Sequence, residues 1–294
     1  MSDERVAIVG AGLMGAQIGC EYALAGHPVV WMVRERARAE ARVERALELV
    51  LRHGLAAGAG VAQARGRMRW CTPADGEEGE LELIVESLPE DLEVKAGVLS
   101  ALCERHPRAA LATNTSSLSV TALGEAVGAG GRTVGTHYWN PPLLMPLVEV
   151  VAARDTPRAL RERVAALLRG IGKRPVILER EVPGLLWNRL QLAVLRECLW
   201  LVEQGVATPQ TIDEVMRDGL ARRWRLTGPF ETVGLGGAST FDAIAENLFP
   251  VLSDATGASF AAHVPSDPEL LAELRERRDD ALAAELRAER ATGR

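Results

Sequence analysis

Residues 6–33, VAIVGAGLMGAQIGCEYALAGHPVVWMV, give the clearest indication of how this chain folds. An apolar, β-branched run leads into a glycine-rich turn, a helical pattern follows, and a second apolar run closes the stretch. Gly10, Gly12 and Gly15 have the spacing GxGxxG between the first run and the helix. In such a turn the first glycine permits a tight bend, the second lets a pyrophosphate approach the backbone, and the third allows close helix–strand packing. The stretch therefore predicts dinucleotide binding.

Outward from this stretch, short apolar runs alternate with helical patterns as far as about residue 182. The expected strands are 5–10, 27–33, 81–87, 109–115, 132–139, 147–153 and 174–180, and the expected helices are 14–25, 35–53, 91–105 and 156–171. This βαβ alternation predicts an α/β fold with a Rossmann-type, doubly wound, mostly parallel sheet. The segment GLAAGAG, 54–60, fits a loop or a frayed helix end.

From residue 183 onward the pattern is helical throughout. Residues 185–205 are apolar on most faces and end at Gly205, a residue typical of helix C-termini. The last segment, 267–290, has alternating charges that predict a solvated helix face. We therefore expect two domains, a nucleotide-binding domain at 1–182 and an all-helical domain for substrate binding and dimerisation at 183–294.

Composition excludes several classes of protein. The chain of 294 residues is 47% apolar with a formal net charge of −6, so it can bury a large core but offers no basic surface to nucleic acid. The N-terminus has no basic segment followed by a signal-peptide core, and no later run is long enough to span a membrane. We expect a cytoplasmic protein with no nucleic-acid or membrane partner. The four cysteines lack metal-ligand spacing, so neither zinc nor a disulfide is expected.

The end of the second strand bears on the choice of cofactor. NAD-binding proteins place an Asp or Glu there for the ribose 2′-hydroxyl, but this chain has Val33, followed by Arg34 and Arg36. Without the acid, a 2′-phosphate is not repelled, and a guanidinium can bind it. The pattern favours NADP(H) weakly over NAD(H). The alternative is that these arginines only cover the start of a solvated helix.

A histidine and a glutamate stand out in THYWNPPLLMPLVEVV, residues 136–151. Glu149 interrupts an apolar strand, twelve residues after His137. Oxidation of an alcohol needs a base for the hydroxyl proton while hydride leaves for a nicotinamide, and a neutral imidazole suits that role. A carboxylate on the other ring nitrogen fixes the tautomer and stabilises the imidazolium. We expect the two residues to meet across paired strands. The alternative is an ordinary core histidine.

Three further islands accompany the glycine turn: NTSSL at 114–118, the HYWNPP segment, and VPGLLWNRL at 182–190. In content, order and spacing these islands resemble the L-3-hydroxyacyl-CoA dehydrogenase family up to about residue 250. The resemblance implies that His137 is the catalytic base and that Glu149 is its partner. It also implies that Ser116 and Asn188 contact the substrate oxygen and that Asn140 is a supporting polar group. It also implies cofactor contacts from Leu13, Met14 and Asn114 besides the glycines and Arg34, with Glu90 and Lys95 near the nicotinamide ribose.

Each of these residues also fits a plainer role. Ser116 and Ser117 fit the N-cap of a helix starting near residue 118, Asn188 fits a polar position on a helix, and Glu90 and Lys95 fit an ordinary helix start. A non-catalytic, crystallin-like scaffold would also keep the fold. A scaffold, however, has no physical need for His137, Glu149, Ser116 and Asn188 together.

The end of the chain departs from the family members that act on CoA thioesters. It lacks their GEGFY-like segment, and GLARRWRLTGPFE, 219–231, resembles the branch that includes lambda-crystallin/L-gulonate 3-dehydrogenase and carnitine dehydrogenase. An arginine beside Trp224 fits a clamp for a substrate carboxylate, or equally a basic helix end or a dimer contact. The substrate stays open between a 3-hydroxyacyl thioester and a small β-hydroxy acid. The resemblance also implies a homodimer.

Overall fold

The computed structural model describes residues 4–74 and 79–292. Its contacts divide the chain into two compact units, Met1–Leu186 with Glu273–Arg294, and Trp187–Ala272. The division therefore falls four residues after the expected boundary at 182, and the C-terminal segment groups with the first unit. The functional division into a nucleotide-binding and a substrate domain stays a prediction.

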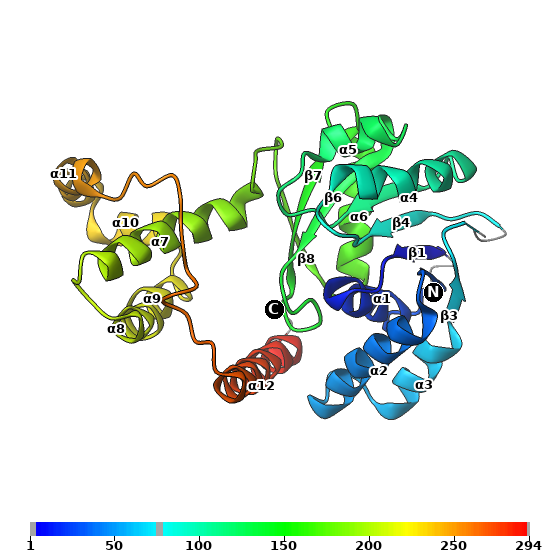
Figure 1. Cartoon of the computed structure of the whole chain (residues 1–294), viewed down its shortest axis with the longest axis horizontal. Helices are drawn as coiled ribbons and strands as arrows, with labels where there is room; N and C mark the ends of the chain where they lie inside the picture. The colour runs from blue at the N-terminus through cyan, green and yellow to red at the C-terminus, as the bar shows by residue number, and fades with distance from the viewer. Residues whose placement is uncertain (1–3, 75–78, 293–294) are drawn as a thin grey trace. The chain divides into compact units, whose positions relative to one another are not determined.

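An eight-stranded sheet forms the centre of the first unit, with the order β3-β2-β1-β4-β5-β6-β7-β8 (Figure 1). The strands are β1 (Val6–Val9), β2 (Val29–Met32), β3 (Met68–Cys71), β4 (Leu83–Glu86), β5 (Ala110–Thr113), β6 (Thr133–Tyr138), β7 (Leu147–Ala152) and β8 (Arg174–Ile177). Among the described strands, the pairing of β6 with β7 is antiparallel and the other pairings are parallel. The predicted Rossmann-type sheet is confirmed. The order reverses between β1 and β4, and the crevice at the carboxyl ends of these two strands is where such sheets bind ligands.

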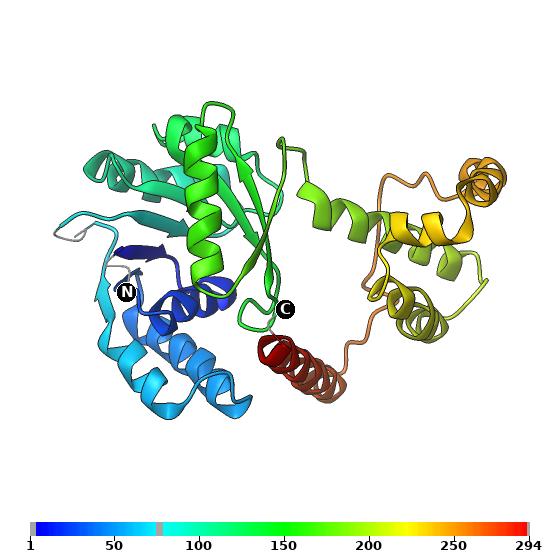
Figure 2. The same ribbon diagram turned by 180° about the vertical axis from the view of Figure 1, so that it is seen from behind.

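Helices cover both faces of this sheet, as the opposite views in Figure 1 and Figure 2 show. One face packs against α1 (Leu13–Leu24), α2 (Arg36–Arg52), α3 (Gly58–Gly66) and α6 (Arg158–Gly170), and the other against α4 (Leu92–Arg105) and α5 (Val120–Ala126). Along β1, Ile8 belongs to the first core and Ala7 to the second. Burial on both faces explains why the inner strands read as continuous apolar runs.

Two elements of the first unit were not expected. β3 pairs with β2 at the sheet edge, and its residues Met68–Cys71 are mostly half-buried with Arg69 exposed. α3 begins at Gly58, so the expected loop at 54–60 ends earlier than predicted. Val61 and Ala64 are fully buried on this short helix, and tertiary packing outweighs the weak helix propensity of its glycines.

The second unit is helical among its described residues, as predicted. It contains α7 (Leu185–Glu203) from Trp187 onward, α8 (Pro209–Glu214), a π-helical turn (Val215–Leu220), α9 (Ala221–Trp224), α10 (Pro229–Gly236), α11 (Ala238–Leu248) and a 3₁₀ turn (Phe249–Val251). Thr208 caps α8 by accepting a hydrogen bond from the Thr211 N–H, 3.2 Å. No helix among residues 4–74 and 79–292 is long and apolar enough to cross a membrane.

The last helix, α12 (Pro268–Thr292), packs against the first unit from Glu273 onward. Ala283 and Leu286 are buried, and Glu289 forms an ion pair of 3.1 Å with Arg174 of β8. The predicted solvated face is present, and the opposite side of the helix is covered. The charged pattern holds over most of the surface of α12, but its small apolar stripe has a partner within the chain.

Candidate active site

The glycine turn has the geometry that dinucleotide binding requires. Gly10 has φ of +94°, and a Cβ there would lie 2.6 Å from Ser87 O. A Cβ on Gly15 would lie 2.0 Å from Gly10 O, so this glycine is needed for close packing under the turn. A Cβ on Gly12 would meet nothing within 4 Å, so the turn faces open space at this position. Gly12 is also the N-cap of α1, without a side-chain cap, which leaves N–H groups of the first turn for an anion.

A cavity of about 560 Å³ lies over this turn at the carboxyl ends of the central strands. Its size is within the range of about 300–1,000 Å³ that is usual for cofactor sites. Seven of the expected cofactor residues line it, namely Gly10, Gly12, Leu13, Met14, Arg34, Glu90 and Asn114. Ser116, expected at the substrate oxygen, also lines this cavity. Gly15 and Lys95 are not among the lining residues. The shape and the residues fit a dinucleotide.

The end of the cavity beside β2 is rich in arginine. Val33 lines it together with Arg34, Arg38 and Arg42, and the residue that follows Arg34, Glu35, contributes a carboxylate. Glu35, Arg38 and Arg42 were not predicted from the sequence. Their signal was the helical spacing of RERARAEAR, which returns a side chain to the same face every three or four residues.

Arg36, by contrast, is engaged outside the cavity lining. Its guanidinium pairs with Glu40 at 2.8 Å and lies 6.0 Å from the centre of the Trp70 ring. Of Arg34 and Arg36, the two arginines named from the sequence, Arg34 is therefore the better placed to contact a cofactor phosphate.

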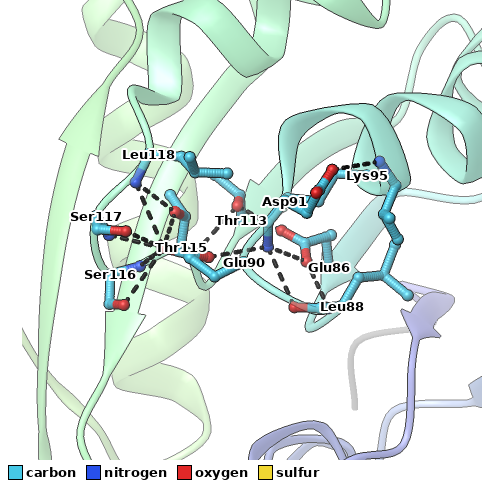
Figure 3. A network of polar contacts seen from close by, with 11 residues as sticks. Glu86, Leu88, Glu90, Asp91, Lys95, Thr113, Thr115, Ser116, Ser117 and Leu118 are labelled. Atoms are coloured by element: carbon cyan, nitrogen blue, oxygen red, sulfur yellow. Dashed lines mark hydrogen bonds and ion pairs between the residues drawn. The ribbon is translucent and has the colours of Figure 1, made fainter.

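Glu90 organises the loop between β5 and α5 (Figure 3). Its Oε1 accepts hydrogen bonds from the Thr115 hydroxyl at 2.6 Å and from the backbone N–H groups of Ser116 and Ser117 at 2.8 and 2.7 Å. Burial raises the pKa of Glu90, but these hydrogen bonds and the nearby ammonium of Lys95 lower it to about 2. Glu90 is thus an anion that holds the loop carrying Ser116.

Lys95 lies behind Glu90. Its ammonium is buried, 2.6 Å from Glu86 Oε1 and 3.4 Å from Glu90 Oε2. Glu86 is itself fully buried, and its Oε2 accepts a hydrogen bond of 2.6 Å from the Thr113 hydroxyl (Figure 3). The ammonium of Lys95 thus lies between two carboxylates, and its predicted place near the nicotinamide ribose stays a prediction. Glu86 was missed from sequence, although an acid ending a buried strand was its signal.

His137 and Glu149 are directly opposite in the register of β6 and β7. His137 Nδ1 and Glu149 Oε2 are 2.7 Å apart, with 6% and 1% of the residues exposed. The predicted contact is present. An ionised carboxylate can only accept, so it favours the tautomer with hydrogen on Nδ1 and leaves Nε2 as the proton acceptor. Glu149 Oε1 accepts a hydrogen bond from Leu186 N–H at 2.8 Å, so the start of α7 also fixes this carboxylate.

Asn114 connects the dyad to the dinucleotide cavity. Its Oδ1 accepts a hydrogen bond of 2.8 Å from the N–H of Tyr138, the residue after His137. The segment after β5 therefore joins the cavity lining to the strand that carries the imidazole.

The N-cap of α5 is Ser119, whose hydroxyl accepts a hydrogen bond of 3.1 Å from Ala122 N–H. The alternative role of Ser116 and Ser117 as N-caps of this helix is therefore wrong.

The remaining predicted residues lie elsewhere in the fold. Asn140 is exposed on the turn after β6 and lines a neighbouring cavity of the first unit. Asn188 belongs to the second unit, on α7, as does Trp224 with its flanking arginines on and after α9. The first unit thus brings together the imidazole, its carboxylate, the glycine turn, Asn114 and the Glu90 loop.

A doubly wound sheet with this glycine turn and cavity defines a dinucleotide-binding protein, and sequence comparison specifies which kind. The 3-hydroxyacyl-CoA dehydrogenase NAD binding domain matches residues 5–182, and the 3-hydroxyacyl-CoA dehydrogenase C-terminal domain matches residues 184–276. The chain belongs to the 3-hydroxyacyl-CoA dehydrogenase family, a family of oxidoreductases that act on CH–OH groups with a nicotinamide cofactor.

Relatives support the branch suggested by the sequence. Lambda-crystallin of Oryctolagus cuniculus is 32% identical over 94% of this chain and 93% of that protein. L-carnitine dehydrogenase of Streptomyces coelicolor is 34% identical over 79% of this chain and 73% of that protein. The solved structure of an NAD⁺-dependent 5-formyl-3-hydroxy-2-methylpyridine 4-carboxylic acid 5-dehydrogenase has a TM-score of 0.85, with 26% identity and 98% of both chains covered.

Proposed function

We propose that this protein interconverts an L-3-hydroxy compound and its 3-keto partner, with His137 as the general base and acid. The observation that carries the proposal is the buried 2.7 Å contact between His137 Nδ1 and Glu149, one strand from the dinucleotide cavity. A buried carboxylate is costly unless it is paired. A histidine with only a structural role does not require such a partner. Glu149 therefore supports a proton-transfer role.

The chemistry follows from these groups. A bound nicotinamide supplies the hydride acceptor or donor. In the oxidative direction, neutral His137 takes the hydroxyl proton at Nε2, and Glu149 stabilises the imidazolium that results. In the reductive direction the imidazolium returns that proton. Ser116, Asn140 and Asn188 are the polar side chains that we assign to the substrate oxygen and its surroundings.

For the substrate, we favour a small β-hydroxy acid over a CoA thioester. By their names, L-carnitine dehydrogenase, which matches 79% of this chain, and the pyridine carboxylate dehydrogenase, which matches 98%, act on free acids. A 3-hydroxyacyl-CoA dehydrogenase structure from Archaeoglobus fulgidus also matches 84% of this chain, so coverage alone does not separate the two substrate classes. The thioester remains the second candidate, since an Escherichia coli 3-hydroxybutyryl-CoA dehydrogenase is 31% identical, with a TM-score of 0.67 over 74% of this chain. Parallel assays with acetoacetyl-CoA and free β-keto acids separate the two.

For the cofactor, we propose a weak preference for NADP(H). Arg34, Arg38 and Arg42 at the β2 end of the cavity suit a 2′-phosphate, whereas Glu35 would suit a 2′-hydroxyl. Calorimetric titration of the protein with NADPH and NADH tests this. Tighter binding of NADPH is expected, and tighter binding of NADH would reverse the preference.

We also propose a homodimer formed through the second unit. Several of its large apolar side chains are exposed, among them Leu226 at 83%, Phe230 at 90%, Leu235 at 78% and Phe249 at 73%. Large apolar side chains with this degree of exposure support a protein interface on this unit.

Turnover decides between an enzyme and a crystallin-like scaffold. The purified chain should oxidise NADPH or NADH when a 3-keto acid or 3-ketoacyl thioester is added. If no 3-keto compound changes the nicotinamide absorbance with either cofactor, the protein is better described as a scaffold.

A further inference from the structure

A second cavity, of about 460 Å³, lies beside the dinucleotide cavity within the first unit. We call it the arginine cavity. Residues of α1, α2, α12 and the turn after β6 form its walls. Leu13 and Arg42 line both cavities, so the two are neighbours.

Four guanidinium groups line the arginine cavity. Arg42 and Arg45 come from α2, and Arg275 and Arg278 come from α12. The only carboxylate among the described lining residues is Asp279, which already pairs with Arg278 at 2.7 Å. The cavity therefore carries a net positive charge that its own walls do not neutralise.

Two of these arginines have their guanidinium groups available. Arg42 donates a hydrogen bond of 3.1 Å to Ala11 O in the glycine turn, which fixes it in place. The guanidinium groups of Arg45 and Arg275, by contrast, make no hydrogen bond or ion pair with any residue that the structure describes. Like charges facing one cavity repel one another, and an oxyanion between them would remove this repulsion. Arginine is also the side chain best suited to bind carboxylate or phosphate through two parallel hydrogen bonds.

The position of the cavity relates it to the proposed reaction. Asn140 and Pro141 form part of its lining, and Asn140 follows His137 by three residues. The remaining walls include Leu13, Ala46 and Leu49, which give an apolar surface beside the charges. Such a site suits a small organic acid, with an anionic group and a short carbon skeleton.

We propose that the arginine cavity binds an oxyanion, and that Arg275 and Arg278 of α12 complete this site. The anion is either the carboxylate of the substrate or a free phosphate ion, and the first source rests on the proposed function. The match to the family's C-terminal domain ends at residue 276, so Arg278 lies beyond it. The site would thus add selectivity for acids to a dehydrogenase fold.

The first experiment measures anion binding directly, without turnover. The full chain is titrated by calorimetry at low ionic strength with malonate and, separately, with inorganic phosphate. The double variant Arg275→Gln/Arg278→Gln should bind one of these anions at least about tenfold more weakly than the wild type. Arg45→Gln, on the opposite wall, should weaken binding of the same anion.

A control variant tests whether the loss of one positive charge from α12 outside the cavity is enough to weaken anion binding. Arg277 is exposed on the same helix and does not line the cavity, so Arg277→Gln should bind the anions as the wild type does. Equal affinity in the wild type, the double variant and the control would overturn the proposal, as would an absence of binding. Circular dichroism melting of each variant shows whether α12 has stayed folded.

The second experiment distinguishes the two sources of the anion. It compares kcat/KM for acetoacetate with kcat/KM for its neutral ethyl ester. If the substrate carboxylate occupies the cavity, the double variant loses activity on the acid but keeps activity on the ester. If phosphate is the ligand, the ratio stays unchanged while phosphate binding falls. If neither compound is turned over, the proposed function is in doubt, and the calorimetry still decides the cavity.

Discussion

A carboxylate in the middle of a covered sheet is the residue that explains most about this protein. Glu149 is 1% exposed, yet both of its oxygens have partners, His137 Nδ1 and Leu186 N–H. The neighbouring strand supplies the imidazole at the same register position, so Glu149 and His137 orient each other. The sequence predicted this pair because an acid interrupts an apolar strand shortly after a histidine at the end of the preceding strand. The structure adds that β6 and β7 are antiparallel, which brings the two residues opposite each other.

Other residues of the site could not be predicted in this way. Lys95 and Glu90 have the spacing of ordinary residues at a helix start, and only the fold shows that one is buried and the other holds a loop. Glu35 lies two positions after Val33, and its place in the cavity depends on how α2 leaves the strand. The role of each of these residues depends on the direction in which its side chain points, and the residue type does not reveal that direction.

Glu149→Gln should lower kcat on the order of 100-fold or more, because a neutral amide no longer stabilises the imidazolium and can select the wrong tautomer. KM should change little. Steady-state kinetics with a 3-keto substrate give both values. A kcat close to the wild type would mean that Glu149 is only structural.

The glycine turn gives a matched pair of variants. Gly12→Ala should fold normally and bind nicotinamide dinucleotides poorly, because the added methyl group points into the open cavity. Gly15→Ala should destabilise the protein by roughly 1–3 kcal/mol, because its Cβ meets the backbone of Gly10. Thermal unfolding and calorimetric cofactor titration separate these effects. Equal stability of the two variants would contradict the assigned roles.

At the scale of elements, the loop between β5 and α5 depends on an anion from the start of another helix. Glu90 accepts hydrogen bonds from several residues of this loop and lines the dinucleotide cavity. The loop can thus keep Ser116 beside the cofactor site without a regular hydrogen-bonding pattern.

The main strands and helices were predictable from apolar periodicity. The short β3 and α3 were not, since each has a weak pattern and forms through packing with its neighbours.

Glu90→Gln should change the pH dependence of stability. The folded-state pKa of Glu90, about 2, lies below its ordinary value, so its ionised form stabilises the fold above that ordinary value, and this contribution is lost as pH falls toward 2. Urea unfolding at several pH values between about 5 and 2 should therefore show a smaller loss of stability in Glu90→Gln than in the wild type. Parallel curves would show that Glu90 does not hold the loop as an anion. Glu93→Gln is the control, because Glu93 is an exposed acid in the first turn of α4, three residues after Glu90.

At the scale of the whole molecule, the two units have different surfaces. The first unit covers its sheet on both faces, and α12 packs against this unit with the buried side chains Ala283 and Leu286. The second unit leaves Phe230 and several other large apolar side chains exposed. Helical periodicity predicted the second unit, but periodicity alone does not say which surface a charged C-terminal helix contacts.

Phe230→Glu should convert the proposed homodimer into a monomer without unfolding it. The side chain is 90% exposed within one chain, so its replacement should change the stability of the isolated chain by only about 0.5 kcal/mol. Light scattering coupled to size-exclusion chromatography gives the mass. A wild-type monomer, or a variant that remains dimeric, would contradict an interface at this residue.

The proposed reaction depends on proton transfer by His137 beside a bound nicotinamide. The most direct test is His137→Gln, assayed for turnover of a 3-keto substrate that the wild type reduces and, in the same preparation, for calorimetric binding of the reduced cofactor. We predict that turnover falls by about 10²–10⁴-fold while the cofactor dissociation constant stays unchanged. Near-normal turnover in His137→Gln would contradict this role of the imidazole.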